Sequence, residues 1–168
     1  KDMKLDCNIQ SLWIGGPLSN MEILSMKSFL HNGHNYHLYT YEPVENVPEG
    51  VIVKDGNEII DKSEIYRYKN GSVSAFSNMF RYKMVFMKGG YWVDTDLICI
   101  KPFDFTEEYI FATEPWEGYR VSKLNPCILK APKLSLPMLN GYKYCVDTKQ
   151  DVLAGKIEWD LGPGSLLK

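Results

Sequence analysis

The fold is decided by residues 74–96, which read SAFSNMFRYKMVFMKGGYWVDTD. Apolar side chains recur at helical spacing through the first part of this stretch, at Phe76, Met79, Phe80, Met84 and Met87. Two glycines then stop the pattern, so the spacing predicts a helix over 74–88. Short apolar segments at 91–93 and 97–100 lie on either side of an acidic triplet and predict two short strands.

Toward the N-terminus, strand and helix patterns alternate. Ser19 and Glu22 stand at the two positions of a capping box, in which each side chain bonds the other residue's backbone amide. A helix should therefore begin there, and Gly33 should end it. The other predicted elements are strands over 9–14, 36–41 and 51–54. Strands joined by helices at short spacing predict an α/β domain with a mostly parallel sheet flanked by helices.

The C-terminal part of the chain gives fewer signals. From Pro102 onward prolines recur, at Pro115, Pro126, Pro132, Pro137 and Pro163, and we expect a loop-rich second half. The length, 168 residues, predicts a single domain over residues 1–168. The first residue is not Met and the end carries no obvious terminal signal, so we expect a piece of a longer protein, truncated at its C-terminus.

The charge balance excludes some partners. The chain has 19 basic and 21 acidic side chains, so it lacks the basic excess that binds nucleic acid or an anionic membrane. Its four cysteines form no CxxC pair, which argues against a zinc site or a disulfide framework and favours a reduced chain. No apolar run approaches the roughly 20 residues that span a bilayer, and no signal-peptide stretch is visible. These features predict a cytoplasmic protein without a membrane span.

The acidic triplet Asp94-Thr95-Asp96 is the sharpest chemical feature. In extended chain its two carboxylates point to the same face, where they repel each other unless a cation lies between them. Oxygen ligation suits Mg²⁺ or Mn²⁺, which commonly take one or two carboxylates and complete their shell with substrate phosphate. A solvated turn is the plainer interpretation, and the motif alone favours it. The position after a strand favours the metal site, because ligands of α/β sheets bind beyond the strands' carboxyl ends.

The predicted helix over 74–88 has a polar face opposite its apolar stripe. Residues three or four apart share that face: Ser74, Ser77, Asn78 and Arg81. Ser77 and Asn78 are poor helix formers, and the Arg81 guanidinium can bond a phosphate or sugar hydroxyls through paired donors. The pattern supports a ligand-binding face and an ordinary solvated helix face equally.

Aromatic residues make up 13% of the chain and serve either a core or platforms for bases and sugar rings. Trp13 ends the first predicted strand beside Gly15 and Gly16, where a ligand can approach the backbone closely, and its indole would stack on a nucleobase. A core tryptophan is an equally good interpretation. The histidines fall on different predicted elements and are interpreted as ordinary histidines rather than a metal cluster: His31, His34 and His37.

Taken together, four stretches resemble the DXD-containing sugar-transferase family, which includes glycosyltransferase family 32 and related capsular-polysaccharide enzymes. They are LWIGG at 12–16, HLYT at 37–40, the helix and DXD segment at 74–96, and LGP at 161–163. The third is the most specific, because it joins a Ser-Asn-x-x-Arg helix, a Gly-Gly-Tyr link and the DXD triplet. The resemblance implies a single Rossmann-like GT-A domain, a nucleoside diphosphate sugar donor, expected to be a UDP-sugar, and a bound Mn²⁺ or Mg²⁺.

The resemblance also implies roles for the matching residues. The residues expected to bind the donor are Trp13 at the base and Ser77, Asn78, Arg81 and Asp94 at the ribose, sugar and diphosphate. Asp94 and Asp96 are the expected metal ligands, and together with Arg81 they are the expected catalytic residues. Relatives often carry Asp in place of Asn78, which leaves the identity of the donor sugar open.

The implied reaction is transfer of the sugar to a hydroxyl of a glycan or another acceptor. A cation acting as a Lewis acid, helped by Arg81, would stabilise the charge on the leaving diphosphate. An inverting enzyme would need a carboxylate base, for which Glu114 and Asp160 qualify by residue type alone. The resemblance leans toward retention of configuration.

The same residues are compatible with two other functions. A catalytically silent nucleotide-sugar-binding module would carry the same donor site, and slow hydrolysis of the donor would distinguish an enzyme from it. A DxD phosphohydrolase of the haloacid dehalogenase kind is disfavoured, because Ile98 stands where that motif has Thr or Val. Residues 114–117, with Trp116 as a second pocket aromatic, and 125–126 are interpreted either as ligand contacts or as connecting loops.

Overall fold

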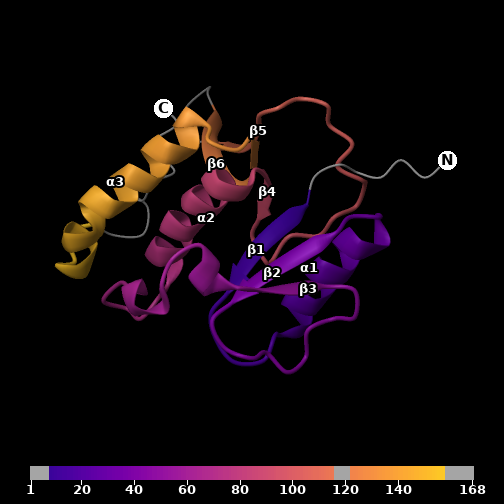
Figure 1. The fold of residues 1–168 in the computed structure, drawn as a ribbon, viewed down its shortest axis with the longest axis horizontal. Helices are drawn as coiled ribbons and strands as arrows, with labels where there is room; N and C mark the ends of the chain where they lie inside the picture. The colour runs from indigo at the N-terminus through magenta and orange to yellow at the C-terminus, as the bar shows by residue number, and fades with distance from the viewer. Residues whose placement is uncertain (1–7, 116–121, 158–168) are drawn as a thin grey trace.

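The computed structural model describes residues 8–115 and 122–157. In these ranges the chain forms one six-stranded sheet with helices on both faces (Figure 1). The elements in chain order are β1 (Ile9–Trp13), α1 (Asn20–His31), β2 (Tyr36–Thr40), β3 (Ile52–Asp55), the 3₁₀ turns η1 (Gly56–Glu58) and η2 (Lys62–Glu64), α2 (Ser74–Lys88), β4 (Gly90–Val93), β5 (Ile110–Pro115), β6 (Ser122–Ala131) and α3 (Leu136–Leu153). None of these described helices is long and apolar enough to cross a membrane.

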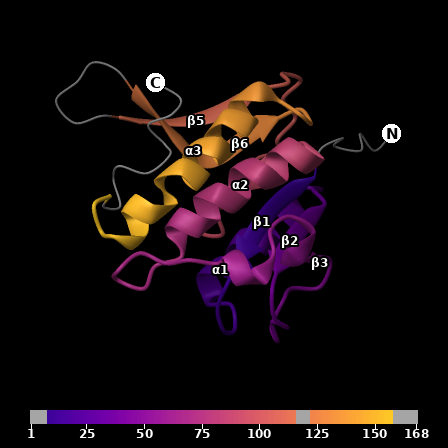
Figure 2. The same cartoon turned by 60° about the vertical axis from the view of Figure 1, so that its left-hand side comes forward.

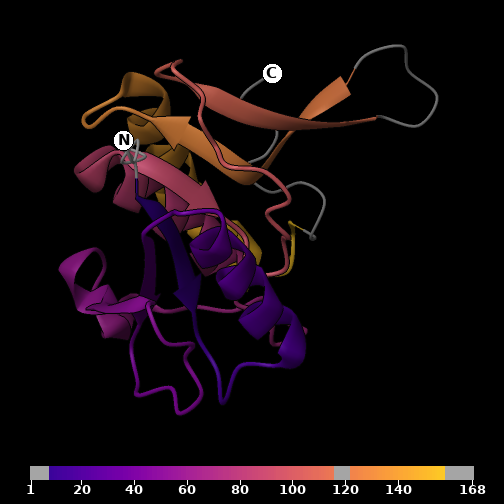
Figure 3. The same ribbon diagram turned by 90° about the vertical axis from the view of Figure 1, so that its right-hand side faces the viewer.

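The sheet has the strand order β3-β2-β1-β4-β6-β5. Its first four strands are mutually parallel, and β6 runs antiparallel to β4 and β5. Helix α1 packs on one face, whereas α2 and α3 lie side by side on the other (Figures 2 and 3). The predicted α/β fold, a mostly parallel sheet flanked by helices, is therefore confirmed. Because β1 to β4 run the same way, their carboxyl ends meet at one edge of the sheet.

Alternation along each strand divides the core between the two faces. The core under α1 contains Ile9, Phe29, Tyr36, Tyr91 and Val93, and the core under α2 contains Leu12, Phe76, Met79, Phe80 and Trp92. The apolar stripe predicted for residues 74–88 is thus the face that α2 buries against the sheet. Residues two apart in β4 share a face, so the residue that follows this strand, Asp94, lies on the α2 side with Trp92.

Two chain reversals follow the predicted local chemistry. The capping box is confirmed, because the Ser19 amide donates to Glu22 Oε2 at 2.7 Å and the Ser19 side chain accepts from the first turn of α1. At the opposite edge of the sheet, Gly89 and Gly90 have φ values of 69° and 84°, in the left-handed region that favours glycine. They connect α2 to β4 without a loop. The first turns of α2 therefore lie near the carboxyl end of β4.

The strand predicted over residues 97–100 is wrong. This segment has no strand partner and crosses α1 instead, where the Cys99 amide donates to Ser28 Oγ at 2.8 Å. The Cys99 carbonyl accepts from Asn32 Nδ2 at 2.9 Å. Side chains of α1 and of its C-cap thus satisfy the backbone groups that a neighbouring strand would have bonded, and the apolar Ile98 and Ile100 stay exposed.

The expectation of a loop-rich second half is also wrong, because β5, β6 and α3 occupy most of the described residues from Pro102 onward. Pro137 lies in the first turn of α3, where the missing N–H costs no hydrogen bond. Gly141 stands inside α3 because a Cβ there would lie 2.8 Å from the Tyr82 ring of α2. Pro126 lies in β6 where the pairing with β5 shifts register, a position that tolerates proline.

Candidate functional site

The candidate site lies at the edge where the parallel strands end. Trp13 of β1 is paired with Thr40 of β2, and Thr40 with Asp55 of β3. Gln10 of β1 is in register with Trp92 of β4. Asp94 is therefore in register with the β1 residue that comes immediately before Trp13. Ser11 Oγ joins the two central strands by donating to the Val93 carbonyl at 2.7 Å. Open α/β sheets bind their ligands at this edge.

An ion pair lies at the end of β4 on the α2 face. Arg81 Nη2 donates to Asp94 Oδ1 at 2.8 Å, and the Arg81 guanidinium lies 4.8 Å above the Trp92 ring. The arginine side chain is 6% exposed and the aspartate side chain 34% exposed, so the pair bridges the core and the surface. Arg81 Nε is buried and makes no hydrogen bond to the described residues. A buried cation with an unused donor is costly to the fold, which points to a functional reason for keeping Arg81 here.

The DXD triplet leaves the sheet as a turn. Asp94 follows β4, its amide donating to the Cys127 carbonyl at 2.8 Å, and Thr95 and Asp96 form the turn with the Asp96 side chain exposed. No group of three or more His, Cys, Asp or Glu side chains in the described ranges is arranged to hold a metal ion. The possible metal ligands are therefore two carboxylates, of which that of Asp94 is held in place by Arg81. This set fits Mg²⁺ or Mn²⁺ that arrives with a diphosphate, because such ions take one or two carboxylates and fill their shell from the substrate.

The first two turns of α2 bring Ser77 and Asn78 to the same end of the sheet. Both side chains are half-buried, and neither hydrogen bonds to another described residue. They lie three or four residues before Arg81, so helical geometry places the three on one side of α2. The structure thus brings together four of the predicted residues around the end of β4: Ser77, Asn78, Arg81 and Asp94.

Trp13 lies at the same edge but on the α1 face. It is half-buried, and Nε1 donates to the Gly16 carbonyl at 2.8 Å, which folds the indole over the turn that follows β1. Gly15 lies beneath the ring, since a Cβ there would be 3.7 Å from the indole. The sheet therefore separates Trp13 from the Arg81–Asp94 pair, and a ligand that touches both must extend around its edge.

Strand β6 contributes Cys127, which no sequence motif indicated, and Asn125. Cys127 is directly opposite Asp94 across the β4–β6 pair, so its half-buried thiol shares the α2 face with the carboxylate. Burial raises the pKa of the Cys127 thiol, and the Asp94 charge raises it further. Asn125 lies in β6 and not in a loop, and its Oδ1 accepts from the Cys127 amide at 2.9 Å. Only antiparallel pairing, which the sequence did not signal, brings these residues to the site.

Glu114 is a strand residue and is already bonded. Its carboxylate accepts from Asn125 Nδ2 at 2.9 Å and pairs with Lys123 Nζ at 2.8 Å. These two partners lower the pKa of Glu114. The interpretation of residues 114–117 and 125–126 as loops is thus wrong for the described part, while Trp116, Asp160 and residues 161–163 lie outside the described residues.

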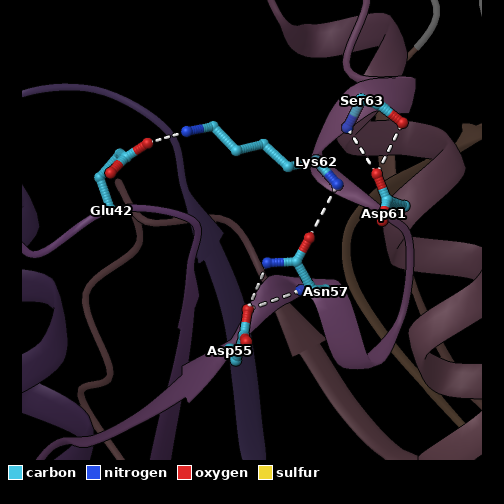
Figure 4. A network of polar contacts seen from close by, with 6 residues as sticks. All are labelled: Glu42, Asp55, Asn57, Asp61, Lys62 and Ser63. Carbon is cyan, nitrogen blue, oxygen red and sulfur yellow. Dashed lines mark hydrogen bonds and ion pairs between the residues drawn. The ribbon is translucent and has the colours of Figure 1, made fainter.

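Acidic residues beyond β2 and β3 serve local turns. Asp55 accepts from the Asn57 amide at the start of η1, and Asp61 accepts from the Ser63 amide at the start of η2, both at 2.8 to 2.9 Å. Lys62 pairs with Glu42 across the same group (Figure 4). Capping and pairing thus account for three of the carboxylates near this edge.

The histidines do not converge. His31 is exposed at the end of α1, and His37 lies within β2. His34 is buried on the α1 face, where its Nε2 accepts from the Phe103 amide at 2.9 Å. Each therefore has a separate environment.

Comparison with known proteins agrees with this geometry. A family model described as "Glycosyltransferase sugar-binding region containing DXD motif" matches residues 18–116, more than half of the chain. Among solved structures the chain is similar to "PaToxG Glycosyltransferase", with a TM-score of 0.62 at 17% sequence identity, over 87% of this chain and 62% of that chain. A search of curated proteins found no match.

The structural likeness and the family model show different things. At this identity the structural likeness shows a shared fold, and the chain spans less than two thirds of that neighbour's length. The family model covers Ser77, Asn78, Arg81, Asp94 and Asp96. The predicted resemblance to DXD sugar transferases is confirmed at this level, and the assignment to glycosyltransferase family 32 stays a prediction. The chain belongs to the family of glycosyltransferase sugar-binding regions that contain the DXD motif.

Proposed function

We propose that this domain is a glycosyltransferase that binds a nucleoside diphosphate sugar with Mn²⁺ or Mg²⁺ and transfers the sugar to a hydroxyl of a saccharide or other acceptor. The observation that carries the proposal is the buried Arg81 paired with the first DXD carboxylate at the carboxyl edge of the sheet. A buried cation paired with the first DXD carboxylate, at the edge where α/β sheets bind their ligands, suits a ligand that is both anionic and metal-bound.

Each residue of the site has a task in this proposal. Asp96 and Asp94 would hold the cation, which when bound would act as a Lewis acid on the departing diphosphate. Arg81 donates to the diphosphate and keeps its position against Asp94, so that it stabilises charge without moving. Ser77 and Asn78 bond the donor's hydroxyls. Because Asn78 carries no charge, it recognises them by hydrogen bonds alone.

The nucleotide extends from this pair around the edge of the sheet to Trp13. Its indole, fixed by the Gly16 carbonyl, offers a ring face to the base. A UDP-sugar is the proposed donor. Glu114 is a weak candidate for the catalytic base, since Lys123 and Asn125 hold its carboxylate and lower its pKa. We therefore do not assign a base, and retention remains the proposed stereochemical course.

A nucleotide-sugar-binding module without transferase activity is the second candidate. The same donor site suits either function, and the chain spans 62% of the structural neighbour's length. Slow donor hydrolysis separates the two functions. A transferase releases sugar to water in the presence of Mn²⁺, and a binding module does not.

Thermal unfolding with a panel of nucleoside diphosphate sugars tests the proposal. UDP- and GDP-sugars are each added with Mn²⁺, with Mg²⁺ and with EDTA. A ligand at one hundred times its Kd stabilises the fold by about 2.7 kcal/mol, so a cognate donor should raise Tm by several degrees only when metal is present. If no donor produces a metal-dependent rise, the proposed function is wrong.

A further inference from the structure

One buried residue at the centre of the site has no role in the proposal above. Trp92 is 1% exposed, faces α2 and packs against Phe80 with ring centroids 6.5 Å apart. A tryptophan in such a place would ordinarily be a core residue. Its indole N–H, however, reaches out of the core and donates to Asp94 Oδ1 at 2.8 Å.

Trp92 contacts both members of the ion pair. Asp94 Oδ1 accepts from Trp92 Nε1 and from Arg81 Nη2, each at 2.8 Å, while the guanidinium lies 4.8 Å from the centre of the Trp92 ring. The ring edge therefore fixes the carboxylate and the ring face fixes the cation. If either charged side chain rotates away, it loses a contact with the indole as well as with its partner.

The consequence for Asp94 is a single orientation. Two donors occupy Oδ1, and the backbone amide is bonded to the Cys127 carbonyl at 2.8 Å. Asp94 Oδ2 accepts no hydrogen bond from the described residues, and the side chain is 34% exposed. Oδ2 is thus the oxygen that a ligand can reach.

We propose that Trp92 is a positioning residue for the donor site. Its indole N–H orients Asp94 so that Oδ2 faces the donor and its cation, and its ring holds Arg81 in place for the diphosphate. Trp92 acts through these two side chains without touching the donor. The inference rests on the proposed function. It adds Trp92 to the residues of the donor site, although only its hydrogen bond to Asp94 distinguishes it from an ordinary core tryptophan.

The test compares Trp92→Phe with Phe76→Leu. The first variant keeps a buried aromatic ring and removes the N–H donor, whereas the second weakens the same core without contacting Asp94. Calorimetric titration of each folded protein with a UDP-sugar and Mn²⁺ should show about tenfold weaker binding for Trp92→Phe, the effect of one hydrogen bond to a charged group. Phe76→Leu should bind within about twofold of wild type, although its Tm is lower.

A second readout needs no donor. In a ¹H–¹⁵N spectrum, the indole signal missing from Trp92→Phe identifies Trp92, and its N–H should exchange slowly with deuterium in wild type and faster in Asp94→Ala. Unchanged exchange would contradict the hydrogen bond. Equal donor affinity of wild type and Trp92→Phe would contradict the positioning role alone. If wild type binds no donor, the proposed function fails, and the role of Trp92 fails with it.

Discussion

The two faces of the sheet differ most where the parallel strands end. Under α1 the core is aromatic and uncharged, and the buried side-chain atoms there that make no hydrogen bond to the described residues include those of two neutral groups, Ser25 Oγ and His34 Nδ1. Under α2 the same sheet buries the cation of Arg81 beside Asp94. A fold gains little from a buried ion pair that apolar residues of similar volume could replace. The charged face is therefore the one that we assign to a ligand.

The largest effect is expected when the cation of the charged face is removed. Arg81→Ala leaves Asp94 without its cationic partner and the diphosphate without its donor, so donor affinity should fall at least about a hundredfold. The free energy of unfolding should also fall, by about 2 kcal/mol, because the carboxylate is partly buried and now unpaired. Titration calorimetry and chemical denaturation measure the two effects. Arg81→Lys, which keeps the charge but loses the planar fork, should lie between wild type and alanine.

The next effect separates the two carboxylates of the triplet. Asp96 is exposed and has no structural partner among the described residues, so Asp96→Ala should abolish the Mn²⁺-dependent rise in Tm while the ligand-free Tm stays within about 1 °C of wild type. Differential scanning fluorimetry with and without Mn²⁺ measures both. Global unfolding of this variant would show that the triplet is a structural turn.

A smaller effect tests whether the ligand reaches the α1 face. Trp13→Ala should weaken binding of UDP by about tenfold, in the range measured for stacking of one base on an aromatic ring. Binding of inorganic pyrophosphate with Mn²⁺ should not change, because pyrophosphate has no base. A parallel loss for both ligands would mean that Trp13 only supports the turn at Gly16.

The smallest effect concerns pH and the α1 face alone. Burial lowers the pKa of His34 from its ordinary value of 6.5, and protonation of Nε2 would break its bond from the Phe103 amide. Below pH 6.5 the unfolded chain therefore binds a proton that the folded chain resists, and stability falls as the pH is lowered. Tm measured between pH 7.5 and 5 should fall less in His34→Gln than in wild type. The pKa of His37 is also lowered, by burial and by Lys54. The fall in Tm of His37→Gln over the same pH range should therefore be compared with that of His34→Gln.

The sequence was most informative where structure is local. The capping box at Ser19, the apolar stripe of α2 and the Gly89–Gly90 stop each depend on residues a few positions apart, and all three are present in the structure. The second half was misread because its regularity depends on distant partners. Gly141 is explained by Tyr82 of another helix, and the length of β6 is explained by its pairing with β4 and β5.

The residues of the candidate site show the same difference between local signals and contacts that depend on distant partners. Arg81 and Asp94 could be named from the motif because helix and strand spacing fix their relative position. The shared hydrogen bond of Trp92 and the position of Cys127 opposite Asp94 could not, since an indole in an apolar strand and a cysteine in a proline-rich segment give no signal of their own. Side-chain direction and antiparallel register decide both features.

The direct connection of α2 to β4 through Gly89 and Gly90 has a consequence for how the protein folds. Arg81 and Asp94 are 13 positions apart, so closing the loop between them costs little chain entropy. Helix α2 with β4 is therefore suited to form early, before β6 arrives from farther along the chain. The proposed binding residues would then be in place in the nucleus of the domain, and mutations that slow its folding should cluster in the same 23-residue stretch to which we assign its chemistry.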